Sequence, residues 1–208
     1  MKKFRILGVF TGKVTKHSDS FESAIKKLPR DVLVIQKHSI VHDEVANLKY
    51  HGGDMRVIHH YSLKNYQALK DKFPEISDRF TPGSFGENIL TEELTESELN
   101  IGDIYSLGTA KVQLTVSRRP CATINQTYQD NRILKEVMHT GRTGWFYRVL
   151  EEGQVKPGDY LEFLERPYPD MPILKLNDLS NLEYLQKCLD TGLMDKGWKP
   201  KILKALEL

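Results

Sequence analysis

Cysteine is scarce in this sequence, and long apolar runs are missing altogether. Only Cys121 and Cys188 occur among 208 residues, too few for a disulfide framework, so we expect two reduced thiols, as in cytoplasmic proteins. No stretch approaches the roughly 18 apolar residues of a membrane span. The N-terminal run MKKFRILGVF is interrupted by Arg5 and is too short for a secretory signal. These absences predict a cytoplasmic protein without a membrane partner.

An excess of charge of one sign is also lacking. The 30 basic and 28 acidic residues give a net charge of +2 and are spread along the chain, which argues against a nucleic acid polymer as partner. No dinucleotide fingerprint, haem motif or Cys-rich cluster is present. Five of the seven histidines lie between His38 and His60, but no cysteine pair with ligand spacing accompanies them. We therefore favour polar loop histidines over a protein-ligated metal.

One stretch combines a strand pattern with a reactive group. Residues 110–117 alternate apolar and polar side chains, which is typical of a strand with one buried face. Pro120 cannot donate to a ladder, so the strand should end there and place Cys121 just beyond it. Arg118 and Arg119 supply positive charge near the sulfur, and cations favour the thiolate. The alternative is a buried structural cysteine beside two solvated arginines.

From those residues alone the two interpretations have equal weight. A second stretch, GRTGWFYRVLEEG at residues 141–153, favours the functional one, because it brings Arg142 and Arg148 around a turn onto another strand. Arginine forks match phosphate oxygens, and a thiolate prefers a soft metal. The residues by themselves therefore predict an anionic ligand with a soft centre.

The pattern of short elements predicts a closed or nearly closed β-barrel of at least seven strands. We expect a loop at 13–30, a helix at 62–73, a helical crossover at 125–139, and strands at 4–10, 31–36, 56–60, 88–90, 101–108 and 157–165 besides that of Cys121. Near-continuous apolar residues suggest that the strand at 31–36 is buried on both faces or forms a barrel wall. After the proline-broken segment 166–169 the chain reads as short helices at 173–179, 182–189 and 200–206, with Cys188 in their core.

Four blocks of the sequence resemble one known family. In chain order these blocks are HGGDMRVIHHY (His51 to Tyr61), PGSFGENIL, SRRPC and GRTGWFYRVLEEGQVKPGDYLEF. This is the order found in the MOSC domain, and the blocks are most similar to its YiiM-like branch of 6-N-hydroxylaminopurine resistance proteins. The resemblance implies a mainly β fold: a MOSC-type β-barrel with a few covering helices at 1–165 and a small C-terminal three-helix appendage at 166–208. Because the appendage contains none of the implied site residues, we expect residues 1–165 to fold alone and keep the cofactor.

The resemblance also implies a cofactor and a set of residues for it. The cofactor is the molybdenum cofactor (molybdopterin), with Cys121 as ligand to molybdenum. The implied catalytic residues are Cys121, His51 and Asn88. The implied cofactor-binding residues are Arg118, Arg142, Arg148, Gly52, Gly53, Glu87, Thr143 and Gly144.

The implied reaction is the reduction of N-hydroxylated compounds such as hydroxylaminopurines. Since no second redox motif is present, the electrons would come from a separate redox protein. Two other classes stay open: a sulfur carrier that uses a Cys121 persulfide, and a non-catalytic module that binds the cofactor. Metal content and turnover with an added electron donor separate the three.

The sequence departs from the family pattern at several places. Val116-Ser117 stands where the family has Gln-Pro, and Thr123 stands where it has a lysine. Either one pocket cation of the family is missing here, or Arg119, which does not fall on a family position, replaces it. His42 replaces a glycine before the aspartate that matches Asp43. Lys27 and Pro29, by contrast, match a family segment of the form I-x-K-x-P.

Overall fold

Seven strands close into a barrel in the computed structural model, which describes residues 2–18, 21–48 and 51–207. Their order is β12–β8–β9–β10–β6–β7–β1, and β1 pairs back onto β12. The strands are β1 (Lys3–Thr11), β6 (Ile58–Ser62), β7 (Ile89–Thr91), β8 (Ile104–Leu107), β9 (Ala110–Ser117), β10 (Trp145–Glu151) and β12 (Tyr160–Glu165). Neighbours are antiparallel except β6 and β7, which are parallel. The predicted mainly β barrel is confirmed.

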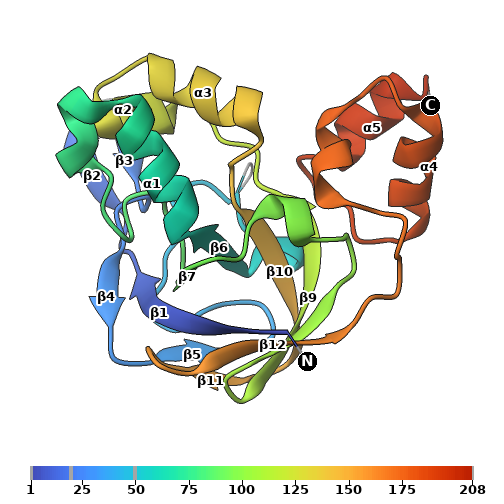
Figure 1. Cartoon of the computed structure of the whole chain (residues 1–208), viewed down its shortest axis with the longest axis horizontal. Helices are drawn as coiled ribbons and strands as arrows, with labels where there is room; N and C mark the ends of the chain where they lie inside the picture. The colour runs from blue at the N-terminus through green and yellow to red at the C-terminus, as the bar shows by residue number, and fades with distance from the viewer. Residues whose placement is uncertain (1, 19–20, 49–50, 208) are drawn as a thin grey trace.

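Helices cover one end of this barrel. Figure 1 shows α1 (Leu63–Lys72), α2 (Thr123–Tyr128) and α3 (Arg132–Thr140) gathered above the strands. The side chain of Ser62 caps α1 by accepting a hydrogen bond from the backbone N–H of Lys64. Single-turn helices are η1 (Asp54–Arg56), η2 (Pro74–Arg79) and η3 (Glu96–Glu98). The predicted crossover is two helices, because Gln129 at the end of α2 adopts a left-handed φ of 53°.

The expected loop at 13–30 was wrong in part. It contains a hairpin of β2 (Thr15–Ser18) and β3 (Phe21–Ser23), and β4 (Leu28–Arg30), which pairs with the end of β1. Backbone groups make these ladders, so polar side chains on an exposed edge do not prevent them. The strand expected at 31–36 is β5 (Leu33–Ile35), paired with β11 (Gly153–Val155) outside the barrel. Val34 is 40% exposed, so β5 is not buried on both faces.

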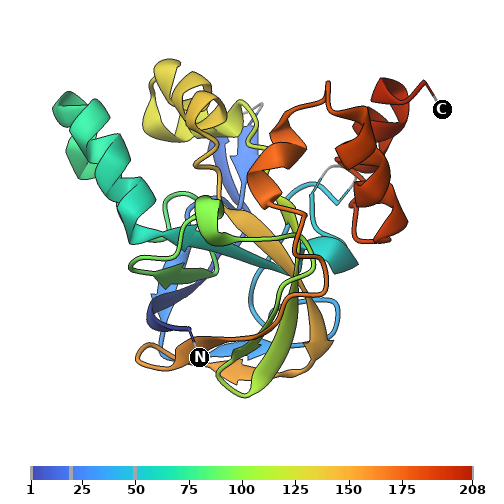
Figure 2. The same cartoon turned by 45° about the vertical axis from the view of Figure 1, so that its right-hand side comes forward.

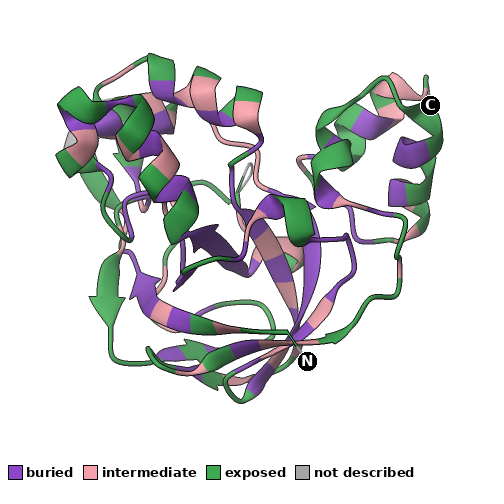
Figure 3. Cartoon of the chain, viewed as in Figure 1, coloured by how far each residue is buried: buried purple, intermediate pink, exposed green. Residues whose placement is uncertain are grey.

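The strand that precedes Cys121 is buried more fully than an alternating pattern predicts. Its apolar residues face the barrel core, and Figure 3 shows buried positions along neighbouring strands as well. Its polar residues Gln113, Thr115 and Ser117 are also buried. Thr115 donates a hydrogen bond of 2.6 Å to the carbonyl oxygen of Met55, so η1 covers the outer face of β9 at this point.

The C-terminal part packs on the barrel through η4 (Ile173–Asn177), α4 (Leu182–Asp190) and α5 (Lys199–Ala205). One apolar cluster runs from the barrel core into these helices and includes Cys188, which is buried as predicted. In Figure 1 and in the turned view of Figure 2, the appendage lies at the end of the barrel that α1, α2 and α3 cover. The division at residue 165 is therefore a change of secondary structure without a break in the apolar core.

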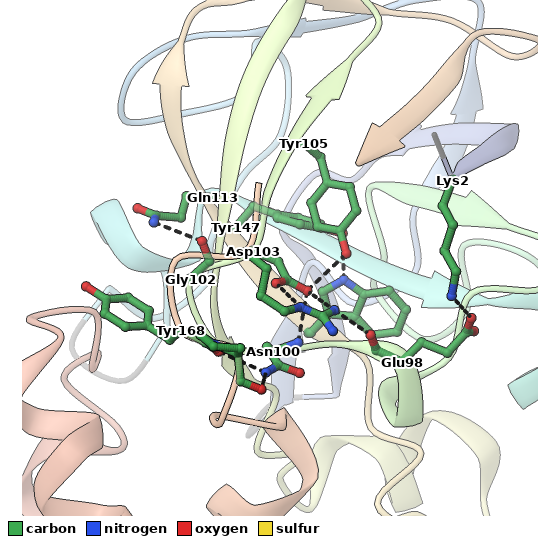
Figure 4. A network of polar contacts seen from close by, with 12 residues as sticks. Lys2, Glu98, Asn100, Gly102, Asp103, Tyr105, Gln113, Tyr147 and Tyr168 are labelled. Carbon is green, nitrogen blue, oxygen red and sulfur yellow. Dashed lines mark hydrogen bonds and ion pairs between the residues drawn. The ribbon is translucent and has the colours of Figure 1, made fainter. Parts of the chain in front are cut away.

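The proline-broken segment is fixed to the barrel by a buried carboxylate. Asp103 is fully buried and accepts two hydrogen bonds from Arg166, of 2.8 and 2.7 Å. The Asn100 amide donates to the carbonyl oxygens of Tyr168 and Pro169, as part of the network in Figure 4. These contacts hold the start of the appendage in one place.

Candidate functional site

A cavity of about 430 Å³ opens at the helix-covered end of the barrel. This volume lies within the range of roughly 300–1,000 Å³ typical of small-molecule and cofactor sites. Five of the residues predicted from the sequence line it: His51, Gly52, Asn88, Arg118 and Cys121. They come from the loop before η1, the loop before β7 and the end of β9.

The end of β9 places Cys121 in the cavity. The backbone N–H of Arg118 makes a last hydrogen bond with the carbonyl oxygen of Gly144 on the neighbouring chain segment, at 2.9 Å. The chain then turns at Pro120 toward α2. The Cys121 sulfur lies 3.2 Å from the hydroxyl oxygen of Thr123, in the first turn of that helix. The alternating strand, the proline and the thiol thus have the predicted spatial order.

Cys121 has the electrostatics of a reactive thiol. Burial raises its pKa, but hydrogen bonds from His51 and Thr123, together with the charge of Arg118, outweigh burial and lower the pKa to about 6. The thiolate is therefore the main form at neutral pH, and thiolate is the nucleophilic and metal-binding form. The sequence attributed this effect to the two arginines. The structure gives the larger part to His51 and Thr123, and places the Arg119 guanidinium over the ring of Trp198, 5.0 Å from its centroid.

Arg118 is the cation beside the thiol. Its Nη1 donates to the carbonyl oxygen of Phe85 at 2.6 Å, and its guanidinium lies 5.0 Å from the centre of the Phe85 ring. Within the part of the chain that the structure describes, no carboxylate forms an ion pair with it. Burial lowers the pKa of Arg118, but an arginine keeps its charge at neutral pH. It therefore offers an anion further N–H donors and a positive charge that the Cys121 thiolate offsets only in part.

Lys27 is a second cavity cation, and it is neutralised by Asp43. The two side chains are almost fully buried, and Lys27 Nζ lies 2.6 Å from Asp43 Oδ2. Burial lowers the pKa of Lys27, and Asp43 opposes that shift. Lys27 was not predicted as a site residue, although the I-x-K-x-P segment was a signal for it. His42, which replaces the family glycine, has a left-handed φ of 65°, so the turn before Asp43 keeps a conformation that favours glycine.

Asn88 uses its side chain to hold other parts of the site. Its Oδ1 accepts from the backbone N–H of His59 at 3.0 Å, and its Nδ2 donates to Asp43 at 2.8 Å and to the carbonyl oxygen of Phe10 at 3.2 Å. The amide is therefore committed to protein partners, which is the arrangement of a positioning residue.

Two more residues of the cavity wall were not predicted, His59 and Arg56. His59 is only 4% exposed, and within the described residues its Nε2 has no hydrogen-bond partner. Burial and the charge of Arg118 lower the pKa of His59 well below its usual value, so the imidazole is neutral. Arg56 forms a buried ion pair with Asp195 of the appendage.

Glu87 lies beside the cavity but does not line it. Its carboxylate is fully buried and accepts from the backbone N–H of Gly83 at 2.6 Å and from the Tyr66 hydroxyl at 2.9 Å. Burial raises its pKa. These contacts stabilise the glycine-containing loop 82–88.

The two arginines of residues 141–153 also lie outside the cavity lining. Arg142 is exposed before β10. Arg148 donates from Nε to the side-chain oxygen of Gln113 at 2.8 Å. Along β10 the buried positions alternate with half-buried ones, and Arg148 occupies a half-buried one.

The predicted small residues have separate roles. Gly144 has a φ of 78°, and a Cβ there would lie 2.5 Å from His59 Nε2 and 2.6 Å from the His60 carbonyl oxygen. Glycine therefore allows β10 to begin against the ring of His59. Thr143 is buried and outside the cavity lining, and Gly53, with a φ of 97°, is exposed.

Residues 2–18, 21–48 and 51–207 contain no group of three or more His, Cys, Asp or Glu side chains that could hold a metal ion. None of their helices has the length and apolar character needed to cross a membrane.

Comparisons with known proteins agree with this architecture. The chain is 35% identical to the protein YiiM of Escherichia coli over 159 residues, which cover 76% of the chain and 71% of YiiM. It is 32% identical to a protein named "Reductase" from Gibberella moniliformis, over 91% of the chain but only 35% of that protein. The crystal structure of YiiM from Geobacillus stearothermophilus superimposes with a TM-score of 0.80 at 26% identity, covering 98% of this chain and 99% of the other. The MOSC domain model matches residues 47–162, more than half of the chain. The chain therefore belongs to the MOSC domain family, and YiiM proteins are among its relatives.

Proposed function

We propose that this protein binds the molybdenum cofactor (molybdopterin), with Cys121 as a ligand to molybdenum, and reduces N-hydroxylated compounds. One observation carries the proposal: a thiol with its pKa lowered to about 6 shares a cavity with the guanidinium of Arg118, which has no carboxylate ion-pair partner among the described residues. A thiolate suits a soft metal, and an arginine fork suits the phosphate of the pterin. The donor set of the cavity therefore fits both ends of this cofactor.

Each residue of the cavity would have a distinct task. Arg118 would bind the phosphate through donors that the Phe85 carbonyl leaves free. His51 would hold the Cys121 sulfur as thiolate through its hydrogen bond. Gly52, with a φ of 67°, lets the backbone approach the ligand closely. Asn88 would keep Asp43 and the backbone of His59 in place.

Arg142, Arg148, Gly53, Glu87, Thr143 and Gly144 stay predictions from the resemblance. Arg142 and Arg148 would have to move to touch a ligand in the cavity, so we assign the anion contact to Arg118.

The bound molybdenum would supply two electrons that, with two protons, convert an N–OH group to N–H and water. A separate redox protein would restore these electrons, because the sequence contains no second redox motif. A small molecule such as a hydroxylaminopurine is the proposed substrate class, and neither a nucleic acid polymer nor a membrane is a proposed partner. Reduced thiols at Cys121 and Cys188 suit the cytoplasm.

The relatives support a redox role in general terms. The protein named "Reductase" matches the chain over 91% of its length, but the chain spans only about a third of that protein.

A sulfur carrier is the second candidate, and the same low thiol pKa favours it. The Cys121 thiolate would attack the terminal sulfur of a donor persulfide, form a new S–S bond and release the donor thiol. No electrons are gained or lost overall in this transfer. A non-catalytic cofactor-binding module is a third candidate.

The test is to purify the protein gently from a molybdate-replete host and measure molybdenum, pterin and cyanide-releasable sulfur. Turnover of an N-hydroxylated purine is then followed with reduced methyl viologen. We expect about equal amounts of molybdenum and protein, turnover by the wild type, and none by Cys121→Ser. Releasable sulfur on Cys121 without molybdenum would favour the sulfur carrier. Bound cofactor without turnover would favour the binding module.

A further inference from the structure

One turn of the C-terminal appendage contacts three segments that form the cavity. This turn, residues 195–198, precedes α5. Asp195 pairs with Arg56 in the cavity wall. Lys196 Nζ donates to the carbonyl oxygen of Leu48, directly after the cavity-lining residues 43–47. The Trp198 indole N–H donates to the carbonyl oxygen of Ser117 at 2.8 Å, at the end of β9 that leads to Arg118 and Cys121.

Both side chains of the Asp195–Arg56 ion pair are buried and held by further contacts. The Arg56 and Asp195 side chains are only 8% and 3% exposed. The other carboxylate oxygen of Asp195 accepts from the backbone N–H groups of Gly197 and Trp198, both at 2.7 Å. Gly197 has no side chain where a Cβ would collide with the Arg56 guanidinium. On its other side, Arg56 lies 5.6 Å from the centre of the ring of Phe146, another cavity residue.

Trp198 fixes the strand end from the other direction. It is almost fully buried, and its ring carries the Arg119 guanidinium. Arg118 and Arg119 therefore point to different neighbours: Arg118 to the cavity and the Phe85 carbonyl, Arg119 to the appendage. A shift of Trp198 would move the carbonyl of Ser117 and, through it, the start of the segment that carries Arg118 and Cys121.

We propose that residues 195–198 are a clasp that positions the ligand-binding side chains of the cavity, so that the appendage is part of the binding site. The inference rests on the proposed function only in taking Arg118 as the site of an anionic ligand. Because coupling between two sites is reciprocal, a ligand that orders the Arg118 segment must also stabilise the clasp, and a weakened clasp must lower the affinity for the ligand. Asp195 and Trp198 are positioning residues in this scheme.

The experiment uses inorganic phosphate as probe on the full-length, cofactor-free protein. Trp198→Phe removes the indole donor to Ser117 and leaves an aromatic ring for Arg119, without a change of charge. Loss of one hydrogen bond predicts about twofold to tenfold weaker phosphate binding by calorimetry. Tyr184→Phe is the matched control, because it removes one hydroxyl donor to the carbonyl of Pro172, within the appendage and away from the cavity. Its phosphate affinity should equal that of the wild type.

Hydrogen exchange on the wild type gives a second measurement that needs no substitution. Saturating phosphate should slow exchange of the amides of residues 195–206, whereas the amides of α4 should not change. A purely structural clasp would show equal exchange with and without phosphate, and that result would overturn the proposal. Phosphate affinities that are equal in Trp198→Phe and the wild type, or a wild type that binds no phosphate, would also overturn it. A wild type that binds phosphate and shows the protection, yet is purified without molybdenum, would contradict the proposed cofactor and leave the clasp intact.

Discussion

The two cysteines of this chain lie in opposite environments. Cys121 follows a strand and lines an open cavity, whereas Cys188 lies on the buried face of α4. Burial raises the pKa of both thiols. At Cys188 a hydrogen bond with Tyr184 only partly opposes this effect and the pKa rises to about 12, whereas at Cys121 the partners His51, Thr123 and Arg118 bring it to about 6. The hydrogen-bond and charge partners of Cys121 therefore make its thiol reactive, whereas burial leaves the thiol of Cys188 inert.

The largest expected effect is on alkylation of the two thiols at pH 7. The thiolate fraction of Cys121 should exceed that of Cys188 by about 10⁵-fold. The thiolate with the lower pKa is also the weaker nucleophile, which reduces the expected ratio of alkylation rates by a factor of about 10³. We expect iodoacetamide to modify Cys121 about 100-fold faster in the cofactor-free protein, measured by peptide mass spectrometry.

The pH profile of this reaction sharpens the comparison. Below the pKa the thiol is protonated and unreactive, so the alkylation rate of Cys121 should rise with pH, reach half its plateau near pH 6 and level off above pH 7. A rate that rises only above the free-cysteine value of about 8.5 would mean that burial dominates at both thiols. Cys188→Ser should leave the profile unchanged.

The second prediction concerns the cation beside the reactive thiol. Arg118→Gln removes a charged hydrogen-bond donor, which typically costs about 1.5–3 kcal/mol, or roughly tenfold to a hundredfold in affinity. Inorganic phosphate binding and cofactor retention should fall by that factor. Arg148→Gln is the control, since Arg148 bonds Gln113 outside the cavity lining. A larger loss in Arg148→Gln than in Arg118→Gln would return the anion site to residues 141–153.

The residues near the thiol were predictable because their signals are local. Alternation, a following proline and a cysteine occupy twelve consecutive residues, and the order of strand end, turn and thiol follows from that sequence alone. The closed barrel was predictable from the number and spacing of short strands. The buried polar face of β9 was not predictable, because η1 and the appendage cover it from distant parts of the chain.

For residues 141–153, the local sequence did not predict which side chains line the cavity. The register of β10 against β9 shifts twice, between Trp145 and Tyr147 and between Val149 and Glu151. Which side of the strand faces the cavity depends on this register, and period-two alternation alone does not fix it. No local sequence pattern indicated the role of Asp195, because its ion-pair partner Arg56 lies 139 residues earlier in the chain.

The third prediction is the contribution of His51 to the low thiol pKa. His51→Ala removes its hydrogen bond to Cys121, so the pKa of the thiol should rise and the midpoint of alkylation should move to higher pH. A hydrogen bond of about 0.5–1.5 kcal/mol corresponds to roughly a twofold to tenfold slower reaction below the midpoint. His38→Ala is the control, because His38 is an exposed histidine that pairs with Asp54. Equal profiles for both variants would assign the shift to Thr123 and Arg118.

The smallest expected effect tests the framework that faces the thiol across the cavity. His42 adopts a left-handed φ of 65° immediately before Asp43, which holds both Lys27 and Asn88. Left-handed backbone costs a residue with a side chain about 1–2 kcal/mol, and glycine avoids this cost. The larger conformational entropy of glycine in the unfolded chain opposes the gain by about 0.4–1 kcal/mol. His42→Gly should therefore raise the free energy of unfolding by about 1 kcal/mol or less in urea titrations. The alkylation profile of Cys121 should not change, because the turn supports the Lys27 side of the cavity and does not touch the partners of the thiol. A destabilised His42→Gly would mean that the imidazole makes a contact worth more than the backbone strain it imposes.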